Sequence, residues 1–198
     1  MAIWSEMARP VAHFGWTNDG GGKMSRGLVH VYYGDGKGKT TAAMGLSVRA
    51  AGCGKTVLIV QFLKGRPSGE VHVLQGIPGI TLLRGNTGEK FSWSMTEAEK
   101  CEARRQGDDL LRTAFQKAQQ GACDLLVLDE AIGACSAELL DADVLLALLR
   151  KRPEGLEVVL TGRGPREDLL ELADYATEMR KEKHPYDKGV LAREGVEF

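Results

Sequence analysis

The chain has 198 residues, of which 43% are hydrophobic and 27% charged, a composition typical of a folded globular protein and not of a disordered chain. Its 26 basic and 27 acidic residues give a net charge of −1, which argues against a nucleic-acid partner, and we expect none. No apolar run approaches the length of a membrane span and no signal pattern opens the chain, so we expect a cytoplasmic protein without a membrane partner. The scattered cysteines form no CxxC pair, and we expect four buried, reduced thiols.

The first 26 residues differ from the rest. They contain the large aromatic residues Trp4, Phe14 and Trp16 without a regular period, and a run of three glycines follows. We interpret residues 1–26 as an N-terminal arm and residues 27–198 as one α/β domain. Two interpretations of the arm stay open: a flexible segment, or a lid that folds over a ligand or a partner.

From Gly27 onward, strand-like and helix-like segments alternate. The helix that starts at Thr96 opens with a capping box made by Thr96 and Glu99. Gly52 is expected to end the first helix in a left-handed turn, and Pro165 to lie in the first turn of the last helix. Strands are predicted at 28–33, 56–62, 80–83, 124–129 and 157–161, and helices at 41–51, 96–121, 144–151 and from 164 onward. This alternation predicts a mostly parallel sheet with helices on both faces.

A glycine-rich turn joins the first strand to the first helix. Its residues are Gly34, Asp35, Gly36, Lys37, Gly38, Lys39, Thr40 and Thr41. Strand, glycine-rich turn, Lys-Thr and helix follow one another as in a phosphate-binding loop, with Lys39 as the ammonium and Thr40 or Thr41 as a hydroxyl ligand of Mg²⁺. Only three residues separate Gly34 from Gly38, one fewer than in the usual loop. The turn therefore predicts binding of a nucleoside triphosphate by a shortened loop.

Acidic residues end the apolar strand at 124–129. Asp129 and Glu130 are expected at the sheet edge that carries the phosphate loop, because parallel strands end at one edge. Carboxylates together with phosphates suit a hard cation, so the pair predicts a magnesium site. A solvated strand end is the alternative, and which carboxylate binds the metal directly stays open.

Three basic residues are candidates for phosphate contacts. Arg163 follows the strand at 157–161, and Lys64 follows the strand at 56–62. Both are therefore expected at the edge of the sheet where the phosphate loop lies. Arg49 lies on the helix after the loop. For Arg163 the alternative is a surface residue in a turn, and Arg49 is also consistent with a solvated residue.

Two aromatic residues, Phe91 and Trp93, lie in a glycine-rich, turn-prone region. Such residues either fill the core or form the wall of a pocket for a large flat ligand.

Together these segments resemble one family, the ATP:corrinoid adenosyltransferases with a phosphate loop. The matching segments lie between residues 27 and 198, and the shortened loop is part of the family pattern. Asp35 stands where some members have Asn. The matching segments are 34–43, 60–65, 91–93, 127–130, 161–164 and the tail from Lys183-His184 to Gly195-Val196-Glu197-Phe198.

The resemblance implies a RecA-like phosphate-loop NTPase fold, a homodimer, and ATP as co-substrate with Mg²⁺ or Mn²⁺. It implies a corrinoid substrate (cobalamin, cobinamide or cobyrinic acid a,c-diamide) with cobalt reduced to Co(I), and a reduced flavoprotein as electron donor. The 5′-carbon of ATP would be joined to cobalt and triphosphate released, as a step of cobalamin biosynthesis or salvage.

The resemblance also implies roles for residues. Lys39 and its loop would hold the phosphates, and Thr40 with Asp129 or Glu130 would hold the metal. Phe91 and Trp93 would lie beside the corrin and help to remove its lower axial ligand. A hydrolytic phosphate-loop ATPase or small-molecule kinase is the main alternative, and it leaves these aromatic residues unexplained.

Overall fold

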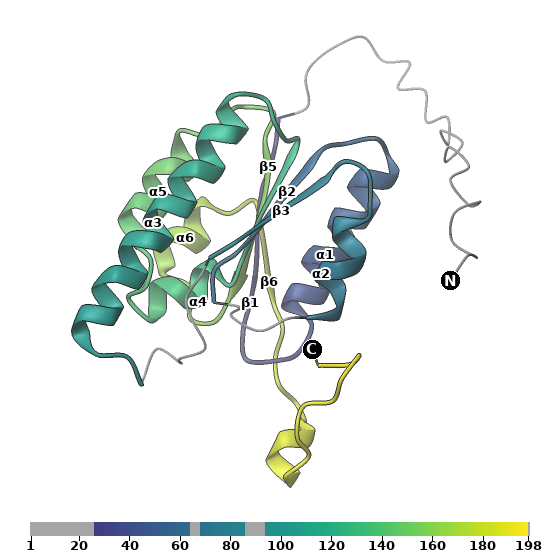
Figure 1. Cartoon of the computed structure of the whole chain (residues 1–198), viewed down its shortest axis with the longest axis vertical. Coiled ribbons are helices and arrows are strands. Elements are labelled where there is room, and N and C mark those ends of the chain that lie inside the picture. Colours follow the sequence, from purple (N-terminus) through teal and green to yellow (C-terminus); the bar gives the residue numbers. More distant parts are fainter. Residues whose placement is uncertain (1–25, 64–67, 86–93, 198) are drawn as a thin grey trace.

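The computed structural model describes residues 26–63, 68–85 and 94–197, which form a sheet with helices on both faces (Figure 1). The sheet has the strand order β3-β2-β4-β5-β1-β6, and every pair of neighbouring strands is parallel. Its strands are β1 (Val29–Tyr33), β2 (Val57–Gln61), β3 (Ile80–Arg84), β4 (Leu125–Asp129), β5 (Glu157–Gly162) and β6 (Tyr175–Glu178). The expected α/β class is confirmed. One strand, β5, separates β1 from β4, as in RecA-like phosphate-loop folds.

Two hydrophobic cores fill the space between the sheet and its helices. One helix layer consists of α1 (Lys39–Gly52) and α2 (Gly69–Gln75). The opposite layer consists of α3 (Glu97–Gln119), α4 (Ala131–Ser136), α5 (Ala142–Arg150) and α6 (Glu167–Leu172). All five residues of β2 and of β4 are buried, because strands covered on both faces expose neither set of alternating side chains. A short 3₁₀ helix, η2 (Pro185–Lys188), follows β6.

The predicted helix starts are only partly correct. The capping box is present: the Glu99 backbone N–H donates to the Thr96 hydroxyl (3.3 Å), and the Thr96 N–H donates to the Glu99 carboxylate (2.8 Å). Pro165, however, precedes α6, which starts at Glu167 after Arg166.

The end of the first helix also differs from the prediction. Gly52 is still helical, and the left-handed residue is Gly54, with φ of 77°. The backbone thus turns two residues later than expected, because Cys53 continues the last turn of α1 as its C-cap.

Among the elements that lie wholly within the described residues, the sequence analysis missed α2, α4, β6 and η2. The helices α2 and α4 have seven and six residues, too few for a periodic apolar signal. All four residues of β6 are exposed, so this edge strand has no apolar alternation to reveal it.

Within the described part of the chain, we find no helix with both the length and the apolar character that a membrane crossing requires.

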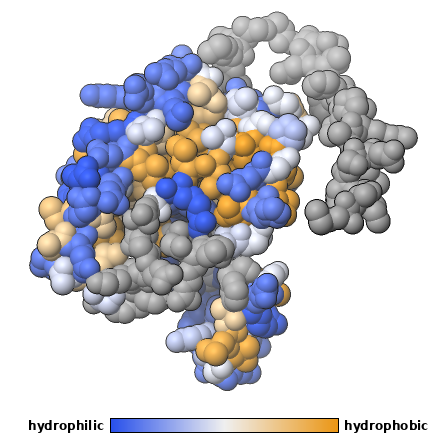
Figure 2. Space-filling model, viewed as in Figure 1, coloured by the Kyte–Doolittle hydropathy of each residue, from blue (hydrophilic) through white to orange (hydrophobic). Residues whose placement is uncertain are grey.

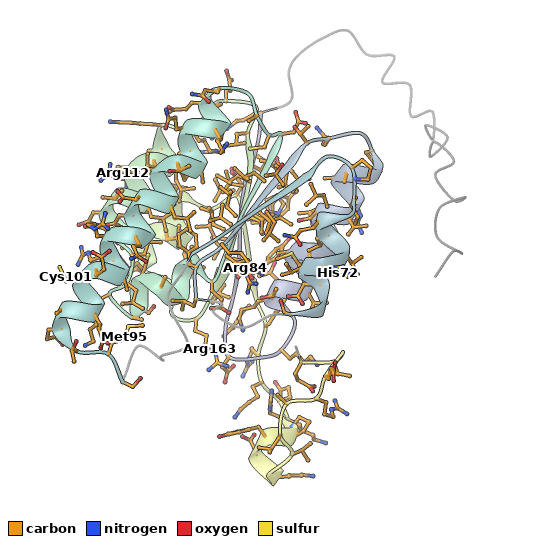
Figure 3. The ribbon with its side chains drawn as sticks, in the orientation of Figure 1. His72, Arg84, Met95, Cys101, Arg112 and Arg163 are labelled. Atoms are coloured by element: carbon orange, nitrogen blue, oxygen red, sulfur yellow. The ribbon has the colours of Figure 1, made fainter. Side chains whose placement is uncertain are left out.

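The cysteines contradict one expectation. Cys123 is buried and Cys135 partly buried, but Cys53 and Cys101 are exposed. Cys53 follows the last residue of α1, and Cys101 lies on the outer side of α3 (Figure 3). Burial raises the pKa of the Cys123 thiol to about 11 and that of Cys135 to about 12.

These environments predict two classes of thiol reactivity. With 5,5′-dithiobis(2-nitrobenzoate), Cys53 and Cys101 of the native protein should react rapidly, whereas Cys123 and Cys135 should react only after unfolding, because the thiolate is the nucleophile. Release of thionitrobenzoate measures both phases. Cys101→Ser should remove half of the rapid phase and Cys123→Ser none of it; rapid reaction of all four thiols would contradict this arrangement.

Candidate functional site

A cavity of about 660 Å³ opens at the carboxyl ends of the strands. Its wall contains the loop between β1 and α1, from Asp35 to Thr41, together with Glu130 and Arg163. Arg163 lies just past the end of β5, at the same end of the sheet as the loop (Figure 3). The structure therefore brings most of the predicted phosphate and metal residues into one cavity.

The glycines of the loop accommodate a neighbouring segment of backbone. Gly34 and Gly38 have φ of 107° and 121°, values that side chains other than glycine rarely allow. A Cβ on either Gly34 or Gly36 would lie 2.6 Å from the carbonyl oxygen of Met179, just after β6. The Gly36 N–H donates to that same oxygen (2.7 Å). The backbone that follows β6 therefore helps to fix the shape of the loop.

Lys39, the first residue of α1, has only 7% of its surface exposed. Its ammonium donates to the carbonyl oxygen of Gly36 (2.8 Å). Burial lowers the pKa of Lys39, and the positive charge of Arg163 lowers it further, against the opposing effects of Glu130 and Asp35. A bound anion would stabilise the charged form of this buried ammonium. The N-terminus of α1 adds partial positive charge at the same point.

The carboxylate of Asp129 is fully buried beneath this cavity. Its Oδ1 accepts from the hydroxyls of Thr40 and Thr161, each at 2.8 Å, and its Oδ2 accepts from the amide of Gln61 (3.1 Å). Gln61 of β2 is the register partner of Asp129 of β4 in this parallel pair of strands. Three elements therefore donate to one carboxylate, which satisfies a charge that would otherwise be costly to bury.

Glu130 comes next in the chain and adopts a left-handed backbone, with φ of 60°. Its N–H donates to the Thr161 hydroxyl (2.9 Å), and its carboxylate lies over Gly133, where a Cβ would come within 2.8 Å of Oε2. Glu130 lines the cavity, whereas Asp129 lies beneath it. The two adjacent carboxylates thus occupy different environments.

The oxygen donors at this end of the sheet suit magnesium. The candidates are the Thr40 hydroxyl and the carboxylates of Asp129 and Glu130, all hard oxygen ligands. Among the described residues no cluster of three His, Cys, Asp or Glu side chains forms a closed metal cage. A small protein donor set completed by substrate phosphates is typical of Mg²⁺, so these residues fit the ion.

Not every predicted residue joins the cavity. Arg49 lies ten residues beyond Lys39 on α1, about 15 Å along the helix axis, and lines a separate cavity of about 340 Å³ with Lys55 and Asp124. The prediction placed it near the phosphates from sequence proximity alone. Lys64, Phe91 and Trp93 lie outside the described residues, as does nearly all of the N-terminal arm.

The sequence marked several other residues of the site as part of the family pattern without indicating what they contact. Gln61 and Thr161 are polar residues at the ends of buried strands, a signal that becomes readable only once the strand order is known. His184 also lines the cavity, and its Nδ1 accepts from the Tyr186 N–H (3.2 Å), as expected for a structural histidine. Gly195, Val196 and Glu197 complete the wall from the C-terminal tail.

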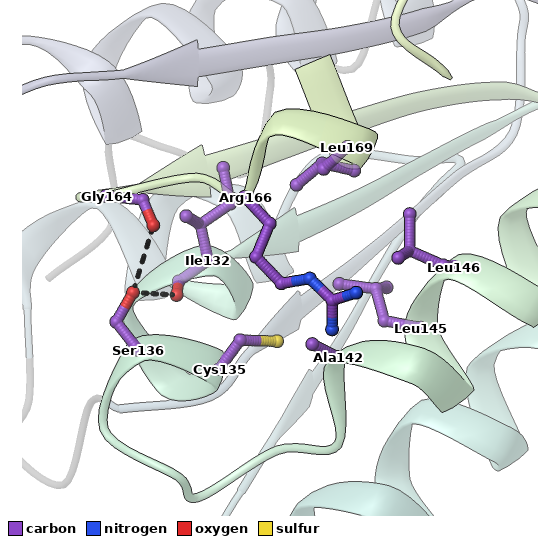
Figure 4. A pocket seen from close by; sticks show the side chains of 9 residues that line it. All are labelled: Ile132, Cys135, Ser136, Ala142, Leu145, Leu146, Gly164, Arg166 and Leu169. Atoms are coloured by element: carbon purple, nitrogen blue, oxygen red, sulfur yellow. Dashed lines mark hydrogen bonds between the residues drawn. The ribbon is translucent and has the colours of Figure 1, made fainter. Parts of the chain in front are cut away.

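A small apolar pocket of about 80 Å³ lies beside the turn that follows β5, where Gly164 and Arg166 form part of its wall (Figure 4). At its edge the Ser136 hydroxyl lies 3.1 Å from the carbonyl oxygen of Ile132, in its own helix, and 3.2 Å from that of Gly164. Ser136 thus links α4 to the turn that follows β5.

Comparisons with known proteins identify one family. The family model "ATP:corrinoid adenosyltransferase BtuR/CobO/CobP" matches residues 25–198. The "Corrinoid adenosyltransferase" of Escherichia coli (strain K12) is 37% identical over 178 residues, which cover 87% of this chain and 86% of that protein. The "Corrinoid adenosyltransferase CobA" of Salmonella typhimurium is 36% identical, covering 87% of this chain and 86% of that protein. The Pseudomonas aeruginosa "Corrinoid adenosyltransferase" is 36% identical, with 87% and 84% covered.

The hydrogen bonds of Thr161 can be tested with a pair of variants. Thr161→Val keeps the shape of the side chain but leaves the Glu130 N–H without its acceptor and removes one donor from Asp129. We expect the free energy of unfolding in urea to fall by about 1–3 kcal/mol. Thr161→Ser keeps the hydroxyl and should lose clearly less; equal losses in the two variants would assign the effect to packing.

Proposed function

The chain belongs to the family of ATP:corrinoid adenosyltransferases, and we propose that it transfers the 5′-deoxyadenosyl group of ATP to the Co(I) of a reduced corrinoid. The observation that carries this proposal is the shortened Gly34–Thr41 loop, in one cavity with Glu130 and Arg163, within a chain that the family model matches almost throughout. The reaction forms a cobalt–carbon bond and releases triphosphate.

The chemistry explains why positioning and charge are the main requirements. The electron pair of Co(I) attacks C5′ of ATP, and the pair of the C5′–O bond leaves with the triphosphate. Since Co(I) is already a strong nucleophile, the protein has to align the reactants and stabilise the charge that leaves. Lys39, Arg163 and the backbone N–H groups of the loop are the candidates for that stabilisation.

We propose that the metal is Mg²⁺ or Mn²⁺ and that the Thr40 hydroxyl and the Glu130 carboxylate would hold it. The burial of Asp129 and its bond from Thr40 favour an orienting role for Asp129 behind the ligands. When bound, the cation neutralises phosphate charge as triphosphate leaves.

The corrinoid is expected to bind beside Phe91 and Trp93, which would help to displace its lower axial ligand; Lys64 would contact phosphate. Figure 2 shows an apolar area between α3 and α2. The apolar residues of α2 and the edge strand β3 include Val73, which is 64% exposed, and Leu82 and Leu83, which are partly exposed. An apolar surface of this kind suits a large macrocycle. A homodimer and a reduced flavoprotein as electron donor complete the proposal.

The alternative of a hydrolytic ATPase or small-molecule kinase differs from this proposal in its products. Incubation with ATP, Mg²⁺ and chemically reduced cobalamin should yield a light-sensitive cobalt–carbon product and triphosphate, whereas ADP with phosphate would support the alternative. Lys39→Ala should lower the rate by about 100-fold or more, because it removes a buried cation from the leaving group. Lys117→Ala, in the last turn of α3, is the matched control and should keep the rate.

The role of Trp93 predicts a difference between two starting states. If Trp93 helps to strip the lower ligand and thereby makes Co(II) easier to reduce, Trp93→Ala should slow the reaction that starts from Co(II) with a reduced flavoprotein. The reaction with pre-formed Co(I) should be affected much less. Anaerobic assays measure the rate of the variant relative to the wild type in each reaction. An equal loss of rate in both reactions would contradict this role for Trp93.

A further inference from the structure

The C-terminal tail returns to the phosphate loop after a long excursion. In Figure 1 it leaves β6, turns at η2 and comes back beside the loop between β1 and α1. The Lys181 N–H donates to the Asp35 carboxylate (3.1 Å) at the start of this excursion. At its end the Lys37 ammonium donates to the carbonyl oxygen of Val196 and to Oε1 of Glu197, each at 2.9 Å.

Glu197 is itself fixed by a second residue of the tail. Nε and Nη2 of Arg193 donate to the two oxygens of its carboxylate, at 3.1 and 3.0 Å, and the Arg193 backbone N–H adds a third bond of 2.8 Å. The bonds from Arg193 and then from Lys37 hold the pKa of Glu197 far below its usual value. Its carboxylate is therefore a charged, oriented acceptor for Lys37.

Lys37 keeps one donor for a ligand. An ammonium has three N–H groups, and the tail uses two of them. The Lys37 side chain is 49% exposed and lies on the wall of the same cavity as Lys39 and Arg163. Lys37, Glu197 and Arg193 together carry a net charge of +1, which favours an anion.

We propose that Glu197 is a positioning residue for the triphosphate: it holds the Lys37 ammonium on the cavity wall so that the remaining N–H meets a phosphate oxygen. The proposal rests on the proposed function only in the identity of the anion. Fixing a long lysine side chain costs rotamer entropy, and the tail removes part of that cost before the anion arrives. Triphosphate and tail then stabilise each other through Lys37.

The direction in which Glu197→Gln changes the affinity for triphosphate separates a positioning role from a simple through-space charge effect. Removing a carboxylate near an anion site should strengthen anion binding through space, and Glu194→Gln, three residues earlier in the tail, is the matched control for that effect. Glu197→Gln should instead weaken binding of inorganic triphosphate with Mg²⁺ by about 2- to 5-fold, the range of an exposed ion pair. Isothermal titration of the full-length protein measures both.

A double-mutant cycle tests the route through Lys37. If Glu197 acts through it, the Lys37→Ala, Glu197→Gln double variant should bind triphosphate no more weakly than Lys37→Ala alone. Additive losses, or a Glu197→Gln variant that binds as tightly as the wild type or more tightly, would overturn the proposal. Thermal unfolding of each variant shows whether the fold is retained.

Protection of the tail gives a second measurement that needs no variant of Glu197. Inorganic triphosphate with Mg²⁺ should slow tryptic cleavage after Arg193 in the wild type, and not in Lys37→Ala; equal cleavage rates with and without triphosphate in the wild type would contradict the coupling. Neither measurement uses adenosyl transfer. A chain that binds triphosphate in this way but forms no cobalt–carbon product would refute the proposed function and leave the role of Glu197 standing.

Discussion

The site depends on one buried carboxylate, that of Asp129. A fully buried charge is tolerated only when donors surround it, and here α1, β2 and β5 each supply one through Thr40, Gln61 and Thr161. The same bonds fix the start of α1 against the sheet. Thr161 accepts in turn from the Glu130 N–H, so a single network sets the position of both the Thr40 hydroxyl and the Glu130 backbone.

The shape of the phosphate loop depends on a second constraint, the segment after β6. Main-chain atoms of Met179 lie so close that neither Gly34 nor Gly36 has room for a side chain. The Gly36 N–H bonds to Met179, which leaves fewer loop N–H groups for phosphate than a free turn would offer. In the proposed binding mode, the side-chain cations Lys37 and Lys39 would therefore carry more of the anion recognition than in a loop whose N–H groups all face the ligand.

Elements whose cause lies within a few residues of sequence could be predicted, whereas elements and contacts set by distant parts of the chain could not. The buried strands β2 and β4 were readable as continuous apolar runs, and the start of α3 as a capping box, since these signals lie within a few residues. The exposed strand β6 forms because β1 offers it an unpaired edge, which no local pattern reveals. Arg49 was placed near the phosphates because it follows the loop in sequence, but a helix carries its far end away from its N-terminus. The contact of Lys37 with Glu197 spans 160 residues, beyond any motif.

The carboxylates around the cavity fit a reaction in which the substrate brings its own nucleophile. Three of them already hold a donor in place: Asp35 accepts a backbone N–H of the tail, Asp129 the Thr40 hydroxyl, and Glu197 the Lys37 ammonium. The pKa of Asp35, like that of Glu197, is lowered by these bonds, and a carboxylate with a low pKa is a poor proton acceptor. A kinase needs such an acceptor for the attacking hydroxyl, whereas attack by Co(I) on carbon releases no proton. The orienting contacts of Asp35, Asp129 and Glu197 are therefore compatible with adenosyl transfer, which needs no general base.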